Sequence, residues 1–286
     1  MPERIDAHHH LWTYRKEDYA WISNEMSVLA RDFLLGDLEE AVAAAGVDGT
    51  VAVQASQTLQ ETEWLLSLAK KSERIRGVVG WAPIASGEFP AILEKWRSEK
   101  KLKGLRHIIQ DEPDEKFMYR EDFNRGISSL AESGLVYDIL IYERHLPAAI
   151  AFVDRHPNQA FVLDHIAKPC IREAILDPWA ANLRELARRD NVYCKLSGMV
   201  TEADWKKWTI GDLRPYFDVV LDAFGPARLM AGSDWPVCLL ASTYAQWFDT
   251  LRDLLESLST SEKDLILGGV ATKVYSLEKP HHTATT

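Results

Sequence analysis

Short apolar segments that alternate with helical segments are the feature that most constrains the fold of this chain. The apolar segments are bounded by Gly, Pro, Asn or Asp, and most are nearly continuous in apolar residues rather than alternating. This pattern is typical of parallel strands that are covered on both faces. Eight such segments occur, at residues 4–9, 50–55, 77–81, 104–109, 136–142, 160–165, 192–196 and 228–232.

Helical periodicity marks most of the segments between these strands. In residues 62–72, for example, Trp64, Leu65, Leu68 and Ala69 form one apolar stripe. Further helices are predicted at residues 37–45, 122–133, 146–155, 178–189, 212–224 and 243–258. Loops are predicted after the first and the seventh strand, at residues 11–33 and 199–211.

The alternation of strand and helix predicts the fold class. We expect one α/β domain, a (β/α)8 barrel (TIM barrel), over residues 1–279, followed by a disordered tail over residues 280–286. A length of 286 residues fits a single barrel. A doubly wound open sheet is the alternative, but the sequence contains neither a glycine-rich dinucleotide fingerprint nor a glycine-rich phosphate-binding loop.

Composition excludes several classes of partner. The chain has 33 Lys and Arg against 43 Asp and Glu, a formal charge of −10, which argues against nucleic acid as a partner. No apolar run approaches the about 18 residues needed to cross a bilayer, and the N-terminus lacks a signal-peptide core. The cysteines, Cys170, Cys194 and Cys238, form no Cys-x-x-Cys pair, so we expect a reducing, cytoplasmic environment. The sequence is compatible with a homo-oligomer and does not determine the oligomeric state.

Polar side chains gather at the carboxyl ends of the predicted strands, where barrel enzymes carry their active sites. The first strand ends in His8-His9-His10, and a period of two places His8 and His10 on one face. Two converging imidazoles can bind a metal ion or donate hydrogen bonds to an anionic substrate or intermediate. A surface histidine run is the alternative interpretation.

Four further strands carry reactive residue types near their carboxyl ends. Arg106 and His107 lie in the fourth strand, and His165, Lys195 and Asp234 belong to the sixth, seventh and eighth. An unpaired charge in a buried strand is costly, so Arg106 is expected to meet a substrate, a carboxylate or the open mouth of the barrel. The combination predicts an active site at the strand ends.

The motifs around these residues resemble the amidohydrolase superfamily. A His-x-His at the end of the first strand and an Asp at the end of the eighth are typical of it. The motifs resemble most closely those of its lactonase branch, which comprises the L-fuconolactonase-like and L-rhamnonolactonase-like enzymes and the 2-pyrone-4,6-dicarboxylate lactonase. Within that branch, the resemblance is strongest to the L-fuconolactonase-like sugar lactonases. The matching segments span nearly the whole chain: IDAHHHLW (5–12), GLRHIIQDEP (104–113), LDHIAKP (163–169), CKLSGMVTEADW (194–205) and FGPARLMAGSDWPVC (224–238).

The resemblance implies a barrel enzyme that hydrolyses the internal ester of a sugar lactone, such as an L-fucono-, L-rhamnono- or L-galactonolactone, to the aldonic acid. Asp234 would act as general base on water. His8, His10, His165 and Arg106 would polarise the carbonyl group or hold the substrate. His107, Lys195, Trp12 and Trp21 are expected to bind substrate, the tryptophans as flat walls against the sugar ring.

The sequence departs from the metal-dependent members of the superfamily on two strands. Those enzymes also use a Lys or Glu on the fourth strand and a His on the fifth, whereas here the fourth strand carries Arg106-His107 and the fifth ends in Ile141-Tyr142-Glu143. The remaining candidate ligands for a divalent metal such as zinc are His8, His10, His165 and Asp234. Because the lactonase branch includes enzymes that work without metal, we expect that no cofactor is required.

Two other functions remain open. A barrel of the same type could be a zinc-dependent amidohydrolase or decarboxylase that acts on an aromatic-derived or muconolactone-type acid. A non-catalytic ligand-binding barrel is the second alternative, which the complete set of Asp234, His8 and His10 argues against.

Overall fold

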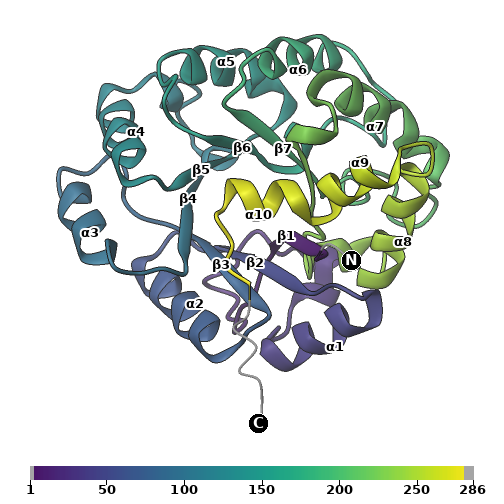
Figure 1. Ribbon diagram of the computed structural model, residues 1–286, viewed down its shortest axis with the longest axis horizontal. Coiled ribbons are helices and arrows are strands. Elements are labelled where there is room, and N and C mark those ends of the chain that lie inside the picture. Colours follow the sequence, from purple (N-terminus) through teal and green to yellow (C-terminus); the bar gives the residue numbers. More distant parts are fainter. Residues whose placement is uncertain (1–2, 280–286) are drawn as a thin grey trace.

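The computed structural model describes residues 3–279 and contains one sheet of parallel strands in the order of the sequence. The strands curve around a central axis as a barrel (Figure 1). β8 returns to the side of β1, where the amide of Asp234 donates to the carbonyl of His8 over 2.8 Å. The strands are β1 Ile5–His9, β2 Gly49–Val53, β3 Ile75–Gly80, β4 Leu102–Ile108, β5 Val136–Leu140, β6 Phe161–Leu163, β7 Val192–Leu196 and β8 Leu229–Ala231.

An outer ring of helices surrounds the strands (Figure 1). One helix follows each strand, and two short helices come after α8 and lie across one end of the barrel. The helices are α1 Leu35–Ala45, α2 Leu59–Lys71, α3 Phe89–Trp96, α4 Glu121–Ser133, α5 Leu146–Asp154, α6 Trp179–Ala187, α7 Ile210–Phe224, α8 Tyr244–Leu254, α9 Thr260–Asp264 and α10 Val270–Val274. The architecture is the single-domain (β/α)8 barrel expected from the sequence.

All eight predicted strands are confirmed, with ends that shift by a few residues, and all seven predicted helices form. The sequence pattern missed the five-residue helices α9 and α10, and it missed α3, which has eight residues and begins with Phe89-Pro90. A proline suits the first turn of a helix, but so short a helix carries little periodicity. The predicted tail over residues 280–286 lies outside the described residues.

Two apolar layers hold the barrel. The larger one lies between the strands and the ring of helices. The smaller one fills the amino-terminal half of the barrel interior, where Val51, Val79 and Met230 pack against α10 and Tyr275. This apolar packing closes the amino-terminal end of the barrel, so the interior is open to solvent toward the carboxyl ends of the strands.

A register shift in β1 turns the carboxyl end of this strand inward. Ile5 pairs with Gly49 and His9 with Ala52, so β1 has one residue more than β2 between these two pairs. Ala7 packs in the interior layer, and the shift lets the next residue, His8, also reach the interior groups. His9 instead binds the Thr50 hydroxyl, 3.0 Å away. The predicted separation of His8 and His10 from His9 is therefore confirmed.

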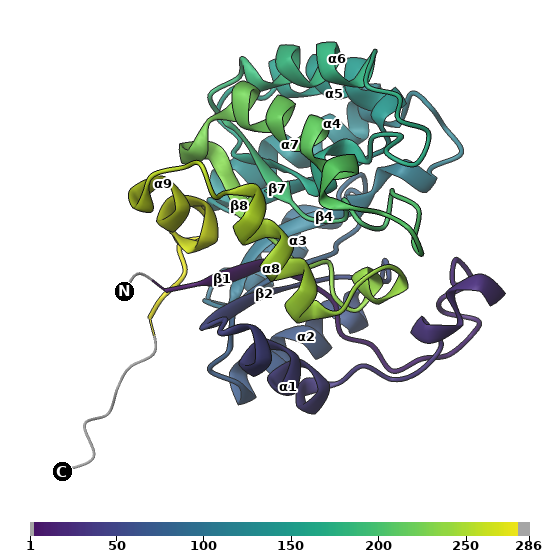
Figure 2. The same cartoon turned by 90° about the vertical axis from the view of Figure 1, so that its right-hand side faces the viewer.

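Long loops extend from the carboxyl ends of the strands. Figure 2 shows the chain after β1 reaching far from the barrel, at the end opposite to the N-terminus and α9. This loop contains a short 3-10 helix, Asn24–Leu29, and returns where Trp12 pairs with Phe33. In residues 3–279, no helix combines the length and the apolar character that a membrane crossing requires.

Candidate active site

A pocket of about 350 Å³ opens at the carboxyl ends of the strands. Its lining comes from loops that follow seven of the eight strands, all but β3, so the barrel brings together residues that are far apart in the sequence. Polar groups and aromatic rings both line it, which is typical of a site for a small polar molecule. Its polar and aromatic lining residues are His10, Trp21, Arg106, Gln110, Asp111, Tyr142, His165, Lys168, Thr201, Glu202, Trp205 and Asp234.

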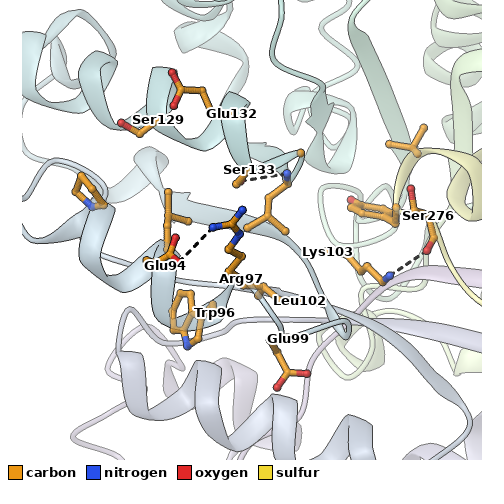
Figure 3. Close-up of a pocket in the computed structure, with 16 residues that line it drawn as sticks. Glu94, Trp96, Arg97, Glu99, Leu102, Lys103, Ser129, Glu132, Ser133 and Ser276 are labelled. Atoms are coloured by element: carbon orange, nitrogen blue, oxygen red, sulfur yellow. Dashed lines mark hydrogen bonds and ion pairs between the residues drawn. The ribbon is translucent and has the colours of Figure 1, made fainter.

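A second hollow, of about 560 Å³, lies between α3, α4 and the chain after α10 (Figure 3). Both of its basic side chains have partners: Arg97 donates to Glu94, and Lys103 donates to the carbonyl of Ser276. The candidate residues His10, His165 and Asp234 all line the first pocket, at the strand ends. Although this hollow is larger, the reactive groups are not in it, and we place the candidate active site at the strand ends.

His8, His10 and Asp234 converge at the base of the pocket. Nε2 of His8 lies 3.1 Å from Nε2 of His10, and Oδ1 of Asp234 lies 3.7 Å and 3.4 Å from these two nitrogens. His165 approaches from β6, with its Nε2 3.8 Å from the same oxygen. The four residues predicted as catalytic are therefore in one cluster, and all four are buried.

The hydrogen bond of the other His10 nitrogen determines what this cluster can hold. Nδ1 of His10 lies 2.8 Å from the carbonyl of Val53, which only accepts, so Nδ1 carries a hydrogen. A neutral His10 then directs a lone pair from Nε2 toward Asp234 and His8. Lone pairs that face one another at 3.1 to 3.4 Å repel, so a hydrogen, such as the one that His8 can carry on Nε2, or a metal ion must lie between these atoms.

His165 is positioned by an unusual turn and by a serine. Its φ of +52° is left-handed, and its Nδ1 lies 2.9 Å from the hydroxyl of Ser197. A hydroxyl can donate or accept, so either nitrogen of His165 can carry the hydrogen. Gly198 is needed beside it, because a Cβ there would lie within 3 Å of the His165 ring and its φ is +68°.

A buried charge network lies directly below the cluster. Arg106 donates to Oδ2 of Asp164 over 2.9 Å, and Lys195 lies 3.0 Å from Oδ1 of the same carboxylate. Lys195 also donates to Asp138 at 2.5 Å, and the Tyr275 hydroxyl lies 2.9 Å from both oxygens of Asp138. Two cations and two carboxylates thus balance inside the barrel, which meets the condition for burying charges.

A further buried carboxylate, that of Asp6, joins β1 to β8 and so fixes Asp234. Asp6 accepts from the amide and hydroxyl of Ser233 and from the Tyr244 hydroxyl, at 2.8, 2.6 and 2.9 Å. Burial raises the pKa of Asp6 to about 6, against these hydrogen bonds. Asp234, which follows Ser233 in the sequence, has a φ of +56°, a strained conformation for a residue with a side chain.

Burial and neighbouring charges set the ionisation of the cluster. Burial raises the pKa of Asp234, but His165, His10 and Lys168 outweigh it, so the pKa lies below its usual value. Burial lowers the pKa of His165 to about 4 and that of His8 well below its usual value. At neutral pH, Asp234 is therefore an ionised base and these two imidazoles are neutral.

The predicted substrate-binding residues divide into two groups. Trp21 lines the pocket together with Arg106. Lys195 is fully buried beneath the pocket, because its long side chain reaches Asp138 and Asp164 inside the barrel. His107 lies beside the pocket, where it binds Glu112 at 2.5 Å and stacks on Phe117.

Trp12 also differs from its expected place. Its ring is fully buried, donates to the carbonyl of Arg31 and packs edge-on against Phe33 and Trp21. Trp12 thus supports the Trp21 wall from behind rather than forming a wall itself. Trp205, on the loop after β7, supplies a second aromatic group of the pocket.

Sequence reasoning missed several residues of the site. Asp138 and Asp164 belong to the buried network, and an aspartate inside the apolar segment 136–142 was an available signal for the first of them. Lys168, Glu202 and Gln110 line the pocket from loops. Their place depends on loop conformations that no local pattern predicts.

Comparison with known proteins identifies the class of enzyme. The family described as Amidohydrolase matches residues 5–277, which is nearly the whole described chain. The chain therefore belongs to the amidohydrolase family. The resemblance inferred from the motifs is confirmed, including its lactonase branch.

Two curated relatives carry the same name, L-fucono-1,5-lactonase. One, from Burkholderia multivorans, is 44% identical over 97% of each chain, and the other, from Burkholderia ambifaria, is 35% identical over 98% of each chain. A crystal structure of an amidohydrolase from Burkholderia multivorans with bound zinc is also similar, with a TM-score of 0.94 and 43% identity over 96% of this chain and 100% of the other.

The residues present fit a divalent metal ion. Two groups have ligand atoms within 4.8 Å of one another: His8, His10 and Asp234, and His8, Asp164 and His165. Because Val53 holds the hydrogen on Nδ1 of His10, the Nε2 lone pair is free for a metal, a common arrangement around bound metals. A set of His8, His10, His165 and Asp234 provides the nitrogen and oxygen ligands that zinc accepts.

Proposed function

We propose that this enzyme hydrolyses the ester of a sugar lactone, an aldono-lactone of the L-fucono-, L-rhamnono- or L-galactono- type, to the aldonic acid. The observation that carries the proposal is the ionised Asp234 carboxylate, surrounded by three imidazoles at the base of a polar pocket with tryptophan walls. The names of the two relatives, which match this chain over nearly their full length, support the same reaction.

Asp234 is the general base of the proposed mechanism. Its lowered pKa keeps the carboxylate ionised at neutral pH, and Oδ1 faces the space between the imidazoles. From this position it accepts a proton from the attacking water. It then returns the proton to the ring oxygen when the ester bond breaks, so the residue ends the cycle ionised.

Donors around the pocket stabilise the oxyanion that forms on the lactone carbonyl. Arg106 lines the pocket and is held by Asp164, and His165 can present Nε2–H when Ser197 donates to its Nδ1. Fixed donors of this kind act where charge develops, in a site that largely excludes water. Lys195 acts through His8 and Asp164, because it does not reach the pocket.

A metal ion, when bound by His8, His10, His165 and Asp234, would supply a Lewis acid for the carbonyl group or the water. We propose that the enzyme does not require it, since Arg106 and His165 already provide fixed hydrogen-bond donors in the pocket.

The charges of the pocket favour a neutral polyol over an acid substrate. Asp234 and the carboxylates of Glu202 and Asp111 face the cavity together with one cation, Lys168, whereas the charge of Arg106 is balanced by Asp164, so the pocket carries more negative than positive charge. A substrate that carries its own carboxylate would be repelled by this wall. The alternative, a zinc-dependent enzyme for an aromatic-derived or muconolactone-type acid, is therefore the weaker proposal.

An assay against a panel of aldono-lactones tests the function. Acid release is followed with a pH indicator, on enzyme as purified and after chelator treatment, and the metal content of both samples is measured. We expect rapid turnover of sugar lactones that survives removal of the metal. Loss of activity that zinc restores would contradict the metal-free mechanism, and no turnover of any sugar lactone would contradict the function. The cytoplasmic location, the absence of a nucleic-acid partner and the oligomeric state stay predictions.

A further inference from the structure

Four consecutive residues after β6 have left-handed backbone conformations. The φ angles of His165, Ile166, Ala167 and Lys168 are +52°, +50°, +62° and +49°, and none of these residues is a glycine. The turn is closed by the amide of Lys168, which donates to the carbonyl of His165 over 2.8 Å. Backbone strain of this kind persists where the surroundings fix it, and it is concentrated at functional sites. Its effect here is that both His165 and Lys168 line the reaction pocket.

The Lys168 ammonium faces the pocket rather than a protein carboxylate. Its Nζ lies 5.4 Å from the centre of the Tyr142 ring, which also lines the pocket. Within residues 3–279, Lys168 takes part in none of the ion pairs at the strand ends, which join Arg106 and Lys195 to buried carboxylates and the imidazoles to Asp234. A half-buried ammonium with an aromatic ring on one side has its hydrogen-bond donors available for a ligand.

Glu202 faces the same pocket from the loop after β7. Its backbone is held at both ends, because its amide donates to the carbonyl of Gly198 and its carbonyl accepts from the amide of Arg172, at 3.3 and 3.0 Å. The side chain is half-buried, and burial raises its pKa while the ammonium of Lys168 opposes this effect. A carboxylate and an ammonium from two loops thus face one cavity, above the Asp234 base.

We propose that Lys168 and Glu202 recognise two neighbouring hydroxyl groups of the lactone ring and so select polyhydroxylated lactones. An ammonium only donates hydrogen bonds and a carboxylate only accepts them, whereas a hydroxyl group does both, so a vicinal diol satisfies the pair. The buried Oε1 of Gln110, also in the pocket wall, has no partner among the described residues and offers a further acceptor.

The proposed selection follows from the cost of leaving polar groups unpaired. A lactone without hydroxyl groups would cover Lys168 and Glu202 without binding them, and buried polar groups built to bind a hydroxyl reject such analogues strongly. This inference rests on the proposed function, because it concerns the same pocket and the same reaction. It adds which residues recognise the substrate, whereas the proposed function concerns the chemistry of Asp234 and its neighbours.

Two substrates and two variants test the inference. The kcat/KM of a polyhydroxylated aldono-1,5-lactone and that of δ-valerolactone, the unsubstituted ring, are measured for the wild type, Lys168→Met and Glu202→Gln. We expect each variant to lower the ratio of kcat/KM for the hydroxylated lactone to kcat/KM for δ-valerolactone by about 10- to 100-fold, mainly because the KM of the hydroxylated lactone rises. The kcat/KM of δ-valerolactone should not fall and should rise where the variant removes the cost of covering an unpaired charge.

Matched controls remove the same charges outside the pocket. Glu173→Gln and Lys206→Met alter exposed residues on the two neighbouring loops and should leave the ratio unchanged. An unchanged ratio in both pocket variants, or an equal loss on both lactones, would overturn the inference, since the second result indicates a catalytic or structural role. If the wild type hydrolyses no lactone at all, the proposed function itself fails, and this inference fails with it.

Discussion

The Nζ atom of Lys195 lies 3.2 Å from Nδ1 of His8, directly below the reaction pocket. The same ammonium is 2.5 Å from Asp138 and 3.0 Å from Asp164, and it is fully buried. Burial is the main reason that the pKa of His8 is low, and the positive charge of Lys195 adds to it against the effect of Asp164. Lys195 therefore keeps His8 neutral and in place without touching the substrate.

Lys195→Met should destabilise the protein by about 3–5 kcal/mol, because it leaves the buried Asp138 without a cation and Asp164 with Arg106 alone. Urea unfolding, with the midpoint and slope fitted for each variant, measures the change. Adding Asp138→Asn should recover part of the loss, since it removes one of the unpaired charges. A single variant within 1 kcal/mol of the wild type, or strictly additive losses in the double variant, would show that the network is not coupled as described.

Asp234→Asn should lower kcat on a sugar lactone by about 10²- to 10⁴-fold, because the amide cannot accept the proton of the attacking water. The side chain keeps its size and sits at the same strained position, so the thermal unfolding temperature should change much less. The rate is measured by acid release and the unfolding by circular dichroism. Near-normal kcat in a folded variant would remove Asp234 from the mechanism.

The pH profile of the wild type should show an ionised base well below neutral pH. The pKa of Asp234 lies below its usual value, and a general base acts in its ionised form, so kcat/KM should stay level from pH 7 down to about pH 5 and fall only below that. The profile is recorded with a buffered stopped-time assay of the aldonic acid. An acid limb with its midpoint near pH 7 would indicate a base other than Asp234.

Trp21→Ala and Trp12→Ala should have different effects. Trp21 is 42% exposed and lines the pocket, so its removal should raise KM for a sugar lactone more than it lowers kcat. Trp12 is fully buried, so its removal should cost about 3–5 kcal/mol of stability. Steady-state kinetics and urea unfolding of both variants measure the two effects. Equal KM values for Trp21→Ala and the wild type would exclude the ring as a substrate wall.

The sequence predicted the fold and the clustering of His8, His10, His165 and Asp234 because both follow from local patterns. Apolar segments identify the strands, and in a barrel the residues after those strands, such as His10, His165 and Asp234, must meet at one end. Lys195 shows the limit of this reasoning. It lies within β7, and its partner Asp138 is on β5, so only the closed barrel reveals that the two charges pair inside.

The loop residues of the pocket could not be predicted for a different reason. Lys168 reaches the pocket because four residues that are not glycine adopt left-handed conformations, which propensity alone disfavours. Glu202 depends on Gly198, whose close approach to His165 is a tertiary contact. Such conformations are stabilised by the finished fold, and the sequence near them carries no periodic signal.

Glu61 gives a prediction on stability that is independent of catalysis. Its buried carboxylate accepts from the amides of Ala55 and Ser56, at 3.1 and 2.7 Å, and so holds the loop after β2 beside the pocket. Burial raises its pKa to about 7 from 4.5, although these hydrogen bonds and Arg106 oppose the shift. The folded protein therefore binds this proton more tightly than the unfolded chain does.

Because the pKa of Glu61 is higher in the folded protein than in the unfolded chain, its tighter proton binding stabilises the fold. This contribution is fully present below pH 4.5 and is lost as the pH rises through 7. The wild type should lose about 3 kcal/mol more than Glu61→Gln between pH 5 and pH 8. Urea unfolding at each pH measures the free energy of unfolding for both. The exposed Glu63 on the same helix supplies the control, since Glu63→Gln should keep the wild-type pH dependence. Parallel curves for the wild type and Glu61→Gln would mean that Glu61 does not take up a proton in this range.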